Sequence, residues 1–213
     1  MMPQQRMLWN VILAGGLVVG LVVGECAPVW AGPPTETLKK TIDEVIRILD
    51  DPAWKKPEKK QERRKLLEEL AGQRFNYTEM AKRALGTEWA KLSPEEQQEF
   101  AVNFQTMLVN TYIGRVENYA GEKVQYLKET VDGKYAEVRT KIVRGESVIA
   151  IEYRLQKSSE DWRVYDVVVG GTSLIQNYRE QFRRIIRKES FAALSEMLRK
   201  KSNEIRAPSL PQE

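Results

Sequence analysis

The sequence predicts an α+β fold, in which helices wrap a curved antiparallel four-stranded β-meander. Three observations lead to this prediction. Between residues 32 and 121 apolar side chains recur every three or four positions, which is typical of amphipathic helices. Over residues 122–170 apolar and polar side chains alternate, and turn signals divide the segment into four runs. From residue 173 to 206 the helical spacing returns, so one sheet is expected between two helical segments.

Residues 1–31 are expected to be a cleaved secretory signal peptide. Arg6 precedes an apolar run from Leu8 to Val23, and Val29 and Ala31 fit a small-residue cleavage site. An uncleaved membrane anchor is the alternative, but the run is shorter than the roughly 20 residues that a spanning helix needs. We therefore expect the chain to be exported.

Cys26 raises a further alternative, a lipid-modified anchor. Glu25 precedes it, however, where lipoproteins with the usual pattern carry a small residue. Cleavage at the predicted site would leave residues 32–206 as a single domain, mainly helical over 32–121, and residues 207–213 as a short tail.

The composition excludes several kinds of chemistry. The 213-residue chain has a net charge of +4, no histidine and one cysteine, Cys26. Without these side chains after residue 31, the domain has no thiol nucleophile, histidine base, disulfide or zinc site of the usual ligand types. The charge surplus falls short of a strongly basic nucleic-acid-binding domain. We expect no cofactor, no metal and no nucleic-acid partner.

Four helices are predicted in the first segment, over residues 33–50, 57–70, 77–85 and 94–119. The strongest start signal is at Ser93, which can cap a helix that has Pro94 at its first position and Glu96 at its third. Gly72 is expected to end the second helix, and Gly86 the third.

The four strands of the meander are expected over residues 124–131, 135–143, 149–156 and 162–169. Asp132 and Gly133 form a two-residue hairpin signal between the first two strands. Alternation in the two middle strands predicts one apolar face, made of Ala136, Val138, Thr140, Ile142, Ile149, Ile151, Tyr153 and Leu155. Because the opposite face is charged, the helices at residues 94–119 and 173–188 are expected to cover the apolar one.

The last strand leads through Gly170 and Gly171 directly into a helix over residues 173–188, and a final helix follows over residues 191–204. Ser173 is the expected N-cap. This helix carries a basic cluster of Arg179, Arg183, Arg184, Arg187 and Lys188. The cluster could receive a phosphate headgroup or an acidic partner, or it could be a solvated helix face.

The same stretch carries a family resemblance. The run from Val164 to Phe182 reads Val-Tyr-Asp-Val-Val-Val-x-Gly-x-Ser-Leu-Ile-x-Asn-Tyr-Arg-x-Gln-Phe. It resembles the signature of the MlaC family, also described as Ttg2-type toluene-tolerance or ABC-transporter auxiliary proteins. Three upstream runs resemble that family in the same order, at residues 75–81, 84–86 and 92–97. The resemblance therefore extends over almost the whole domain.

This resemblance implies a periplasmic carrier that holds the acyl chains of a phospholipid in an apolar cavity and shuttles it between the two membranes. It also implies two partners, an inner-membrane ABC transporter complex with a substrate-binding subunit and an outer-membrane lipoprotein complex. The carrier is expected to be a monomer with phospholipid as its cargo. From the residues alone, a packed core is the alternative to a cavity.

The residues expected to line the cavity come from the long helix at 94–119, the inner face of the sheet and the helix at 173–188. They are Phe104, Met107, Leu108, Val138, Thr140, Ile142, Ile149, Ile151, Tyr153, Tyr165, Val167, Val169, Leu174, Tyr178 and Phe182.

Asp166 lies among apolar residues of the last strand and is open to two interpretations. It could be a catalytic carboxylate of a small pocket enzyme, or a structural anchor that pairs with Arg179 or caps a neighbouring helix. The anchor is favoured, because no histidine, cysteine or clear second acid accompanies it. A third possibility for the whole chain is a ligand-free envelope adaptor with a solid core.

Overall fold

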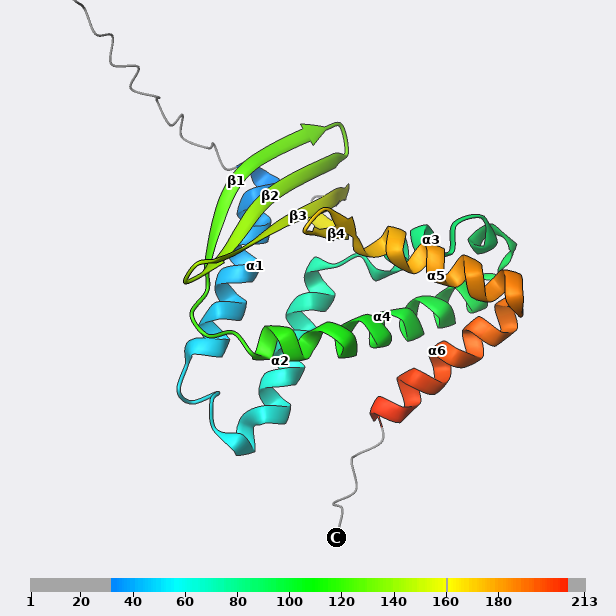
Figure 1. Cartoon of the computed structure of the whole chain (residues 1–213), viewed down its shortest axis with the longest axis horizontal. Coiled ribbons are helices and arrows are strands. Elements are labelled where there is room, and N and C mark those ends of the chain that lie inside the picture. The colour runs from blue at the N-terminus through cyan, green and yellow to red at the C-terminus, as the bar shows by residue number, and fades with distance from the viewer. Residues whose placement is uncertain (1–31, 160, 207–213) are drawn as a thin grey trace, which may run out of the picture.

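One antiparallel sheet stands over one end of a layer of helices (Figure 1). The computed structural model describes residues 32–159 and 161–206. The helices of this part of the chain are α1 (Pro33–Asp50), α2 (Lys60–Arg74), α3 (Tyr77–Leu85), α4 (Pro94–Glu117), α5 (Leu174–Lys188) and α6 (Phe191–Arg206), with short 3-10 helices at Pro57–Lys59 and Gly86–Lys91. The predicted signal peptide and tail lie outside the described residues.

The sheet consists of β1 (Lys123–Asp132), β2 (Tyr135–Arg144), β3 (Ser147–Ser158), β4 (Asp161–Val169) and β5 (Thr172–Ser173). Each strand pairs with the next in antiparallel orientation, so the predicted α+β meander is confirmed. The two-residue β5 was not predicted. It forms because Gly170 and Gly171 both have positive φ, 56° and 82°, and fold the chain back onto β4 before α5 begins.

The first hairpin turns one residue later than predicted. Asp132 still pairs with Tyr135, so the two loop residues are Gly133 and Lys134. Gly133 has a φ of 55° at the first loop position, where a glycine avoids the steric cost that another residue would meet.

Gly72 was predicted to end the second helix, but α2 continues to Arg74. The last turn of α2 is held by β4. The Arg74 guanidinium donates to the Trp162 carbonyl oxygen at 2.6 Å, and Arg163 donates to the Gly72 carbonyl oxygen at 2.9 Å. These long-range contacts offset the low helix propensity of glycine.

The start of α4 and the end of α3 follow the local signals. Ser93 and Glu96 form the predicted capping box, in which each side chain accepts from the backbone of the other. Gly86 follows α3 with a φ of 63°.

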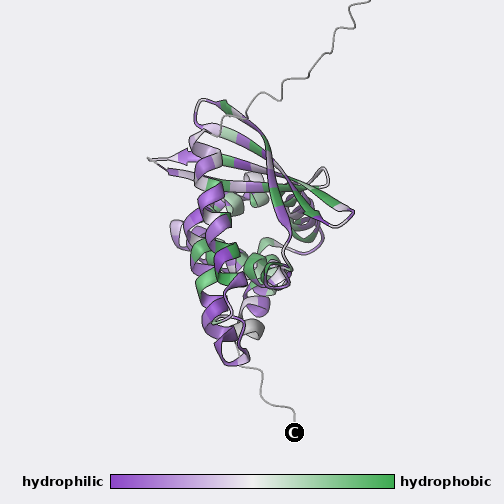
Figure 2. Ribbon diagram, turned by 90° about the vertical axis from the view of Figure 1, so that its left-hand side faces the viewer, coloured by the Kyte–Doolittle hydropathy of each residue, from purple (hydrophilic) through white to green (hydrophobic). Residues whose placement is uncertain are grey.

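The buried apolar side chains form three clusters. The largest joins α3, α4, α5 and α6 around Phe104, which is 0% exposed. A second packs Leu38 of α1 against Val138 and Leu155 of the sheet. The third holds α1, α2 and α4 together around Leu67. Figure 2 shows hydrophobic and hydrophilic residues alternating along the strands above this helical layer.

Candidate functional site

The strand register places the predicted apolar residues on one face of the sheet. Residues paired directly across antiparallel strands project from the same side. Val138 pairs with Tyr153, which pairs in turn with Val167. We call this side the inner face, with the members Ala136, Val138, Thr140, Ile142, Ile149, Ile151, Tyr153, Leu155, Val167 and Val169.

Only one half of the inner face is covered. Leu38 of α1 packs where Val138 and Leu155 lie, and both of these residues are 0% exposed. The predicted cover by the helices at residues 94–119 and 173–188 is wrong, because their apolar side chains pack into the cluster with α3 and α6 instead. At the other half, Ile149 is 46% exposed and Val169 is 47% exposed. The residues between them, Ile142, Ile151, Tyr153 and Val167, are partly buried. The sheet therefore presents a continuous apolar surface that becomes more open toward one end of the strands.

Apart from Glu129 at the closed half, described below, the polar side chains named on the inner face are uncharged. The Thr140 hydroxyl donates to the Ile151 carbonyl oxygen at 3.2 Å. Tyr126, which pairs with Thr140, has a buried hydroxyl without a hydrogen-bond partner among the described residues. Burial raises the pKa of Tyr126, and it raises the pKa of Tyr153 to about 12. Both phenols therefore stay neutral at physiological pH, and the face suits an apolar ligand.

Glu129 of β1 positions the helix that covers the closed half. It pairs with Val138 in the register, and its Oε2 accepts from the Thr35 backbone N–H at 2.7 Å. Thr35 lies in the first turn of α1, where a carboxylate also interacts favourably with the helix dipole. Sequence reasoning missed both Glu129 and Tyr126. The interrupted alternation of the first strand hid them, because a bulge lies between Tyr126 and Lys128.

The predicted site residues on the helices lie elsewhere. Phe104, Met107, Leu108, Tyr178 and Phe182 are buried in the cluster of α3 to α6, and Leu174 packs against that cluster. The Phe104 ring centroid lies 5.4 Å from that of Tyr178 and 5.5 Å from that of Phe182, both in edge-on geometry. These side chains form a close-packed aromatic core, and the structure does not place them among the residues of the inner face.

Tyr165 also belongs with the helical cluster. Arg154 pairs with Asp166 while Leu155 pairs with Val164, so Tyr165 is the extra residue of a bulge in β4. Its ring lies under the Arg83 guanidinium, 4.0 Å from the centroid. A sequence pattern does not reveal such a shift in register.

Asp166 is a structural anchor, the role that the sequence favoured over a catalytic carboxylate. Its side chain is 5% exposed. Oδ2 accepts from the Ser173 hydroxyl at 2.7 Å and from Arg154 Nη1 at 3.2 Å, and Oδ1 accepts from the Ile175 N–H at 3.1 Å. The predicted capping of a neighbouring helix is confirmed, whereas the predicted partner Arg179 is wrong. Arg154 takes that place because it pairs with Asp166 directly across the sheet.

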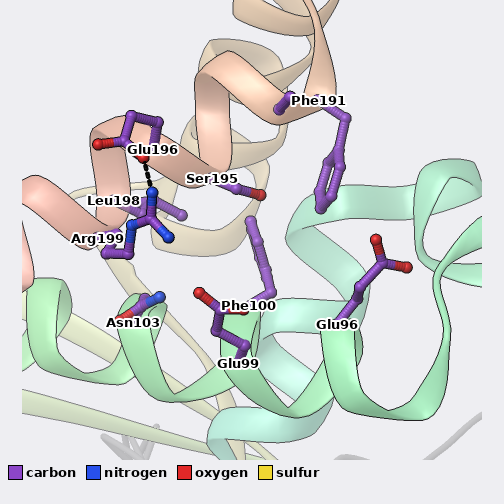
Figure 3. Close-up of a pocket in the computed structure, with 10 residues that line it drawn as sticks. Glu96, Glu99, Phe100, Asn103, Phe191, Ser195, Glu196, Leu198 and Arg199 are labelled. Atoms are coloured by element: carbon purple, nitrogen blue, oxygen red, sulfur yellow. Dashed lines mark hydrogen bonds and ion pairs between the residues drawn. The ribbon is translucent and has the colours of Figure 1, made fainter.

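A separate pocket of about 330 Å³ lies between α4 and α6 (Figure 3). Phe100 and Phe191 line it together with Glu96 and Glu99, and Glu196 there forms an ion pair with Arg199. None of the predicted site residues lines this pocket.

Within residues 32–159 and 161–206, no group of three His, Cys, Asp or Glu side chains is placed to hold a metal ion. No helix in the same ranges is long and apolar enough to cross a membrane.

Residues 39–200 match the model of the MlaC protein family. The chain belongs to the MlaC family. The family that the sequence motifs suggested is thereby confirmed, and the match includes both the inner face and the helical cluster of this MlaC-family protein.

Two curated relatives match parts of the chain. The intermembrane phospholipid transport system binding protein MlaC of Haemophilus influenzae is 25% identical over 118 residues, 53% of this chain and 55% of that protein. The toluene tolerance protein ttg2D of Pseudomonas putida is 29% identical over 94 residues, 43% of this chain and 44% of that protein. The matched part thus spans about half the length of each relative.

A solved structure supports the fold over a longer range. The phospholipid-binding protein of Ralstonia solanacearum, in complex with a phospholipid, has a TM-score of 0.71 and 25% sequence identity. The similarity covers 83% of this MlaC-family chain and 100% of the other.

Proposed function

We propose that this MlaC-family protein is a phospholipid carrier that transports lipid between two membranes and catalyses no reaction. The observation that carries the proposal is the open half of the inner face, an uncharged apolar surface in a fold similar to that of a protein solved with a phospholipid. The name of the Haemophilus relative, which describes an intermembrane phospholipid transport system, supports the same function.

In this proposal the acyl chains lie along the open half of the inner face, against Ile142, Ile149, Ile151, Val167 and Val169. Tyr153, Val138 and Thr140 form the deeper end, where α1 closes the sheet. The buried Tyr126 hydroxyl without a partner is a donor that an ester oxygen of the lipid could satisfy. The aromatic cluster of α4 and α5 supports the fold on which this surface is built.

The energetics explain why a carrier needs such a face. Two acyl chains contain on the order of thirty methylenes, and exposing each to water costs ~0.8 kcal/mol. The total of tens of kcal/mol prevents unaided transfer at a useful rate. A carrier that covers the chains and leaves the headgroup in water removes most of this barrier, without any chemical step.

Two features favour a carrier over the pocket enzyme. Membership of the MlaC family supports a non-enzymatic role. Both oxygens of Asp166 are engaged in hydrogen bonds that join β4 to α5, so this carboxylate is not available as a catalytic base.

We further propose that the protein acts in the periplasm after cleavage of residues 1–31, as a monomer. Its partners would be an inner-membrane ABC transporter complex with a substrate-binding subunit and an outer-membrane lipoprotein complex. Family membership supports these partners.

Native mass spectrometry of protein purified without detergent tests the proposal. We expect a mass increment of one diacyl phospholipid per chain, which organic extraction removes and identifies. A protein that is folded and monodisperse but empty would refute the carrier, and would favour the ligand-free adaptor instead.

A further inference from the structure

The outer face of α5 carries an unusual concentration of positive charge. Five cations are exposed on this 15-residue helix, namely Arg179, Arg183, Arg184, Arg187 and Lys188. Glu180 is its only acidic residue. The resulting surplus of four positive charges equals the net charge of +4 of the whole chain, so the rest of the chain is neutral on balance.

The charged groups of these five side chains have no polar partner inside the described part of the chain. None of the five forms an ion pair or a hydrogen bond with another residue of 32–159 or 161–206. By contrast, four cations of α1, α2 and the 3-10 helix between them, Lys39, Arg47, Lys59 and Arg64, each pair with a carboxylate three or four residues away. Unpaired charges held together on one helix repel each other, which an anionic surface would relieve.

We infer that the outer face of α5 docks the protein onto the anionic surface of a lipid bilayer. The cations extend along about 14 Å of helix, at a rise of about 1.5 Å per residue. Four of the five are arginines, whose planar guanidinium groups bind phosphate in bidentate geometry. A membrane leaflet rich in acidic phospholipids presents such phosphates over a broad area.

The chemistry of the face favours a bilayer over an acidic protein. Protein interfaces usually have an apolar or aromatic centre. The large hydrophobic side chains that are exposed in the described ranges lie on α4 and on β1 to β4, and none of them is on α5. The outer face of α5 instead contains Gln176, Asn177 and Glu180 beside the cations. Attraction to a charged bilayer needs no apolar centre.

The purpose of this docking, the transfer of lipid to or from a membrane, rests on the proposed carrier function. Val169, at the open end of the inner face, lies five residues before the start of α5. A bilayer held by α5 would therefore be near the end of the sheet where lipid could enter or leave.

Sedimentation with vesicles tests the docking. Protein expressed from the full chain is mixed with vesicles of pure phosphatidylcholine or of equal parts phosphatidylcholine and phosphatidylglycerol. We expect binding to the anionic vesicles alone, weakening as salt is added. The R183Q/R184Q/R187Q variant should bind at least tenfold more weakly, since each basic residue near an anionic surface strengthens binding about fivefold.

The matched control is K40Q/K56Q/K60Q, which removes the same charge from exposed lysines of α1, α2 and their linker. We expect it to bind anionic vesicles within about twofold of the unmodified protein, because charges away from the surface are screened. Equal losses in the two variants, or equal binding to both kinds of vesicle, would overturn the docking. So would a failure to bind vesicles, and an acidic protein would then be the partner to seek.

Cargo is counted by native mass spectrometry in the same samples, which separates the two proposals. An empty protein that still binds anionic vesicles would refute the carrier function alone. A lipid-loaded protein that ignores them would refute the docking alone.

Discussion

The Asp166 carboxylate accepts a hydrogen bond from the Ile175 backbone N–H at 3.1 Å and thereby fixes the start of α5 to β4. Its other oxygen accepts from Ser173 and Arg154. A carboxylate at this end of a helix also interacts favourably with the helix dipole. One buried side chain thus joins the sheet to the helix that carries the basic face.

Replacing Asp166 with Ala should lower the free energy of unfolding by about 2–4 kcal/mol, because three donors lose a charged acceptor. Urea denaturation measures the change. Ser173→Ala removes one of these donors and the N-cap, and should cost about 1 kcal/mol. The lipid bound per folded molecule should not change in either variant. A loss for Asp166→Ala no larger than for Ser173→Ala would contradict the anchoring role.

Local signals predicted most of the element boundaries. The capping box at Ser93 and the glycine at Gly86 act within a few residues, so the sequence alone reveals them. The extension of α2 past Gly72 depends on Arg163 of β4, 91 residues away in the chain. Such a contact leaves no trace in the local pattern, which explains why that boundary was wrong.

The inner face was only partly predictable for a similar reason. Strict alternation assigned Val138 and Ile149 to the same side of the sheet, and the register agrees. The alternation of apolar and polar residues does not reveal which part of that side a helix covers. In the structure α1 covers Val138 and leaves Ile149 46% exposed. On the helices, an apolar stripe fits a cavity wall and a solid core equally well, so Phe104 could not be assigned to either.

The contact between Glu129 and Thr35 should stabilise the cover of the closed half. Glu129→Gln keeps the shape of the side chain but removes the charge that the N-terminus of α1 favours, at a cost of about 0.5–1 kcal/mol. Because the interaction is electrostatic, the difference from the unmodified protein in urea denaturation should shrink at high salt. A difference that is absent at low salt would show that α1 is held by packing alone.

The aromatic cluster should behave as a packed core. Phe104 is 0% exposed and contacts the rings of Phe100, Tyr178 and Phe182. Phe104→Ala should lower the free energy of unfolding by about 3–5 kcal/mol, and Phe104→Leu by less than about 1.5 kcal/mol. Calorimetry measures stability, and native mass spectrometry measures cargo. A loss of cargo in Phe104→Leu at nearly unchanged stability would place this side chain at the lipid instead.

Buried tyrosines should make the protein sensitive to alkali. The pKa of Tyr153 and of Tyr178 is raised to about 12, mainly by burial. In the unfolded chain these phenols ionise near pH ~10. Between these two values the unfolded state has lost protons that the folded state retains, so the free energy of unfolding falls as pH rises. Each phenol contributes a slope of about 1.4 kcal/mol per pH unit.

Tyr178→Phe and Tyr153→Phe should each make this fall shallower. The measurement is the free energy of unfolding from urea denaturation at a series of alkaline pH values. Subtracting the difference between variant and unmodified protein near neutral pH removes any effect of the substitution on packing. An identical slope in the variants and the unmodified protein would mean that other groups govern the alkaline unfolding.

Two neighbouring residues offer the sharpest test of the lipid site. Ile149 and Val148 are 46% and 54% exposed, but successive residues of a strand project from opposite faces. Ile149→Glu places a carboxylate where the acyl chains are proposed to lie, and burying that charge against them would cost several kcal/mol. The bound lipid should therefore fall at least tenfold.

The matched control, Val148→Glu, adds the same charge to the outer face and should retain its lipid. Both variants should stay within about 1 kcal/mol of the unmodified protein in stability, since both sites are exposed. Equal lipid content in the two would exclude the open half of the inner face as the binding surface.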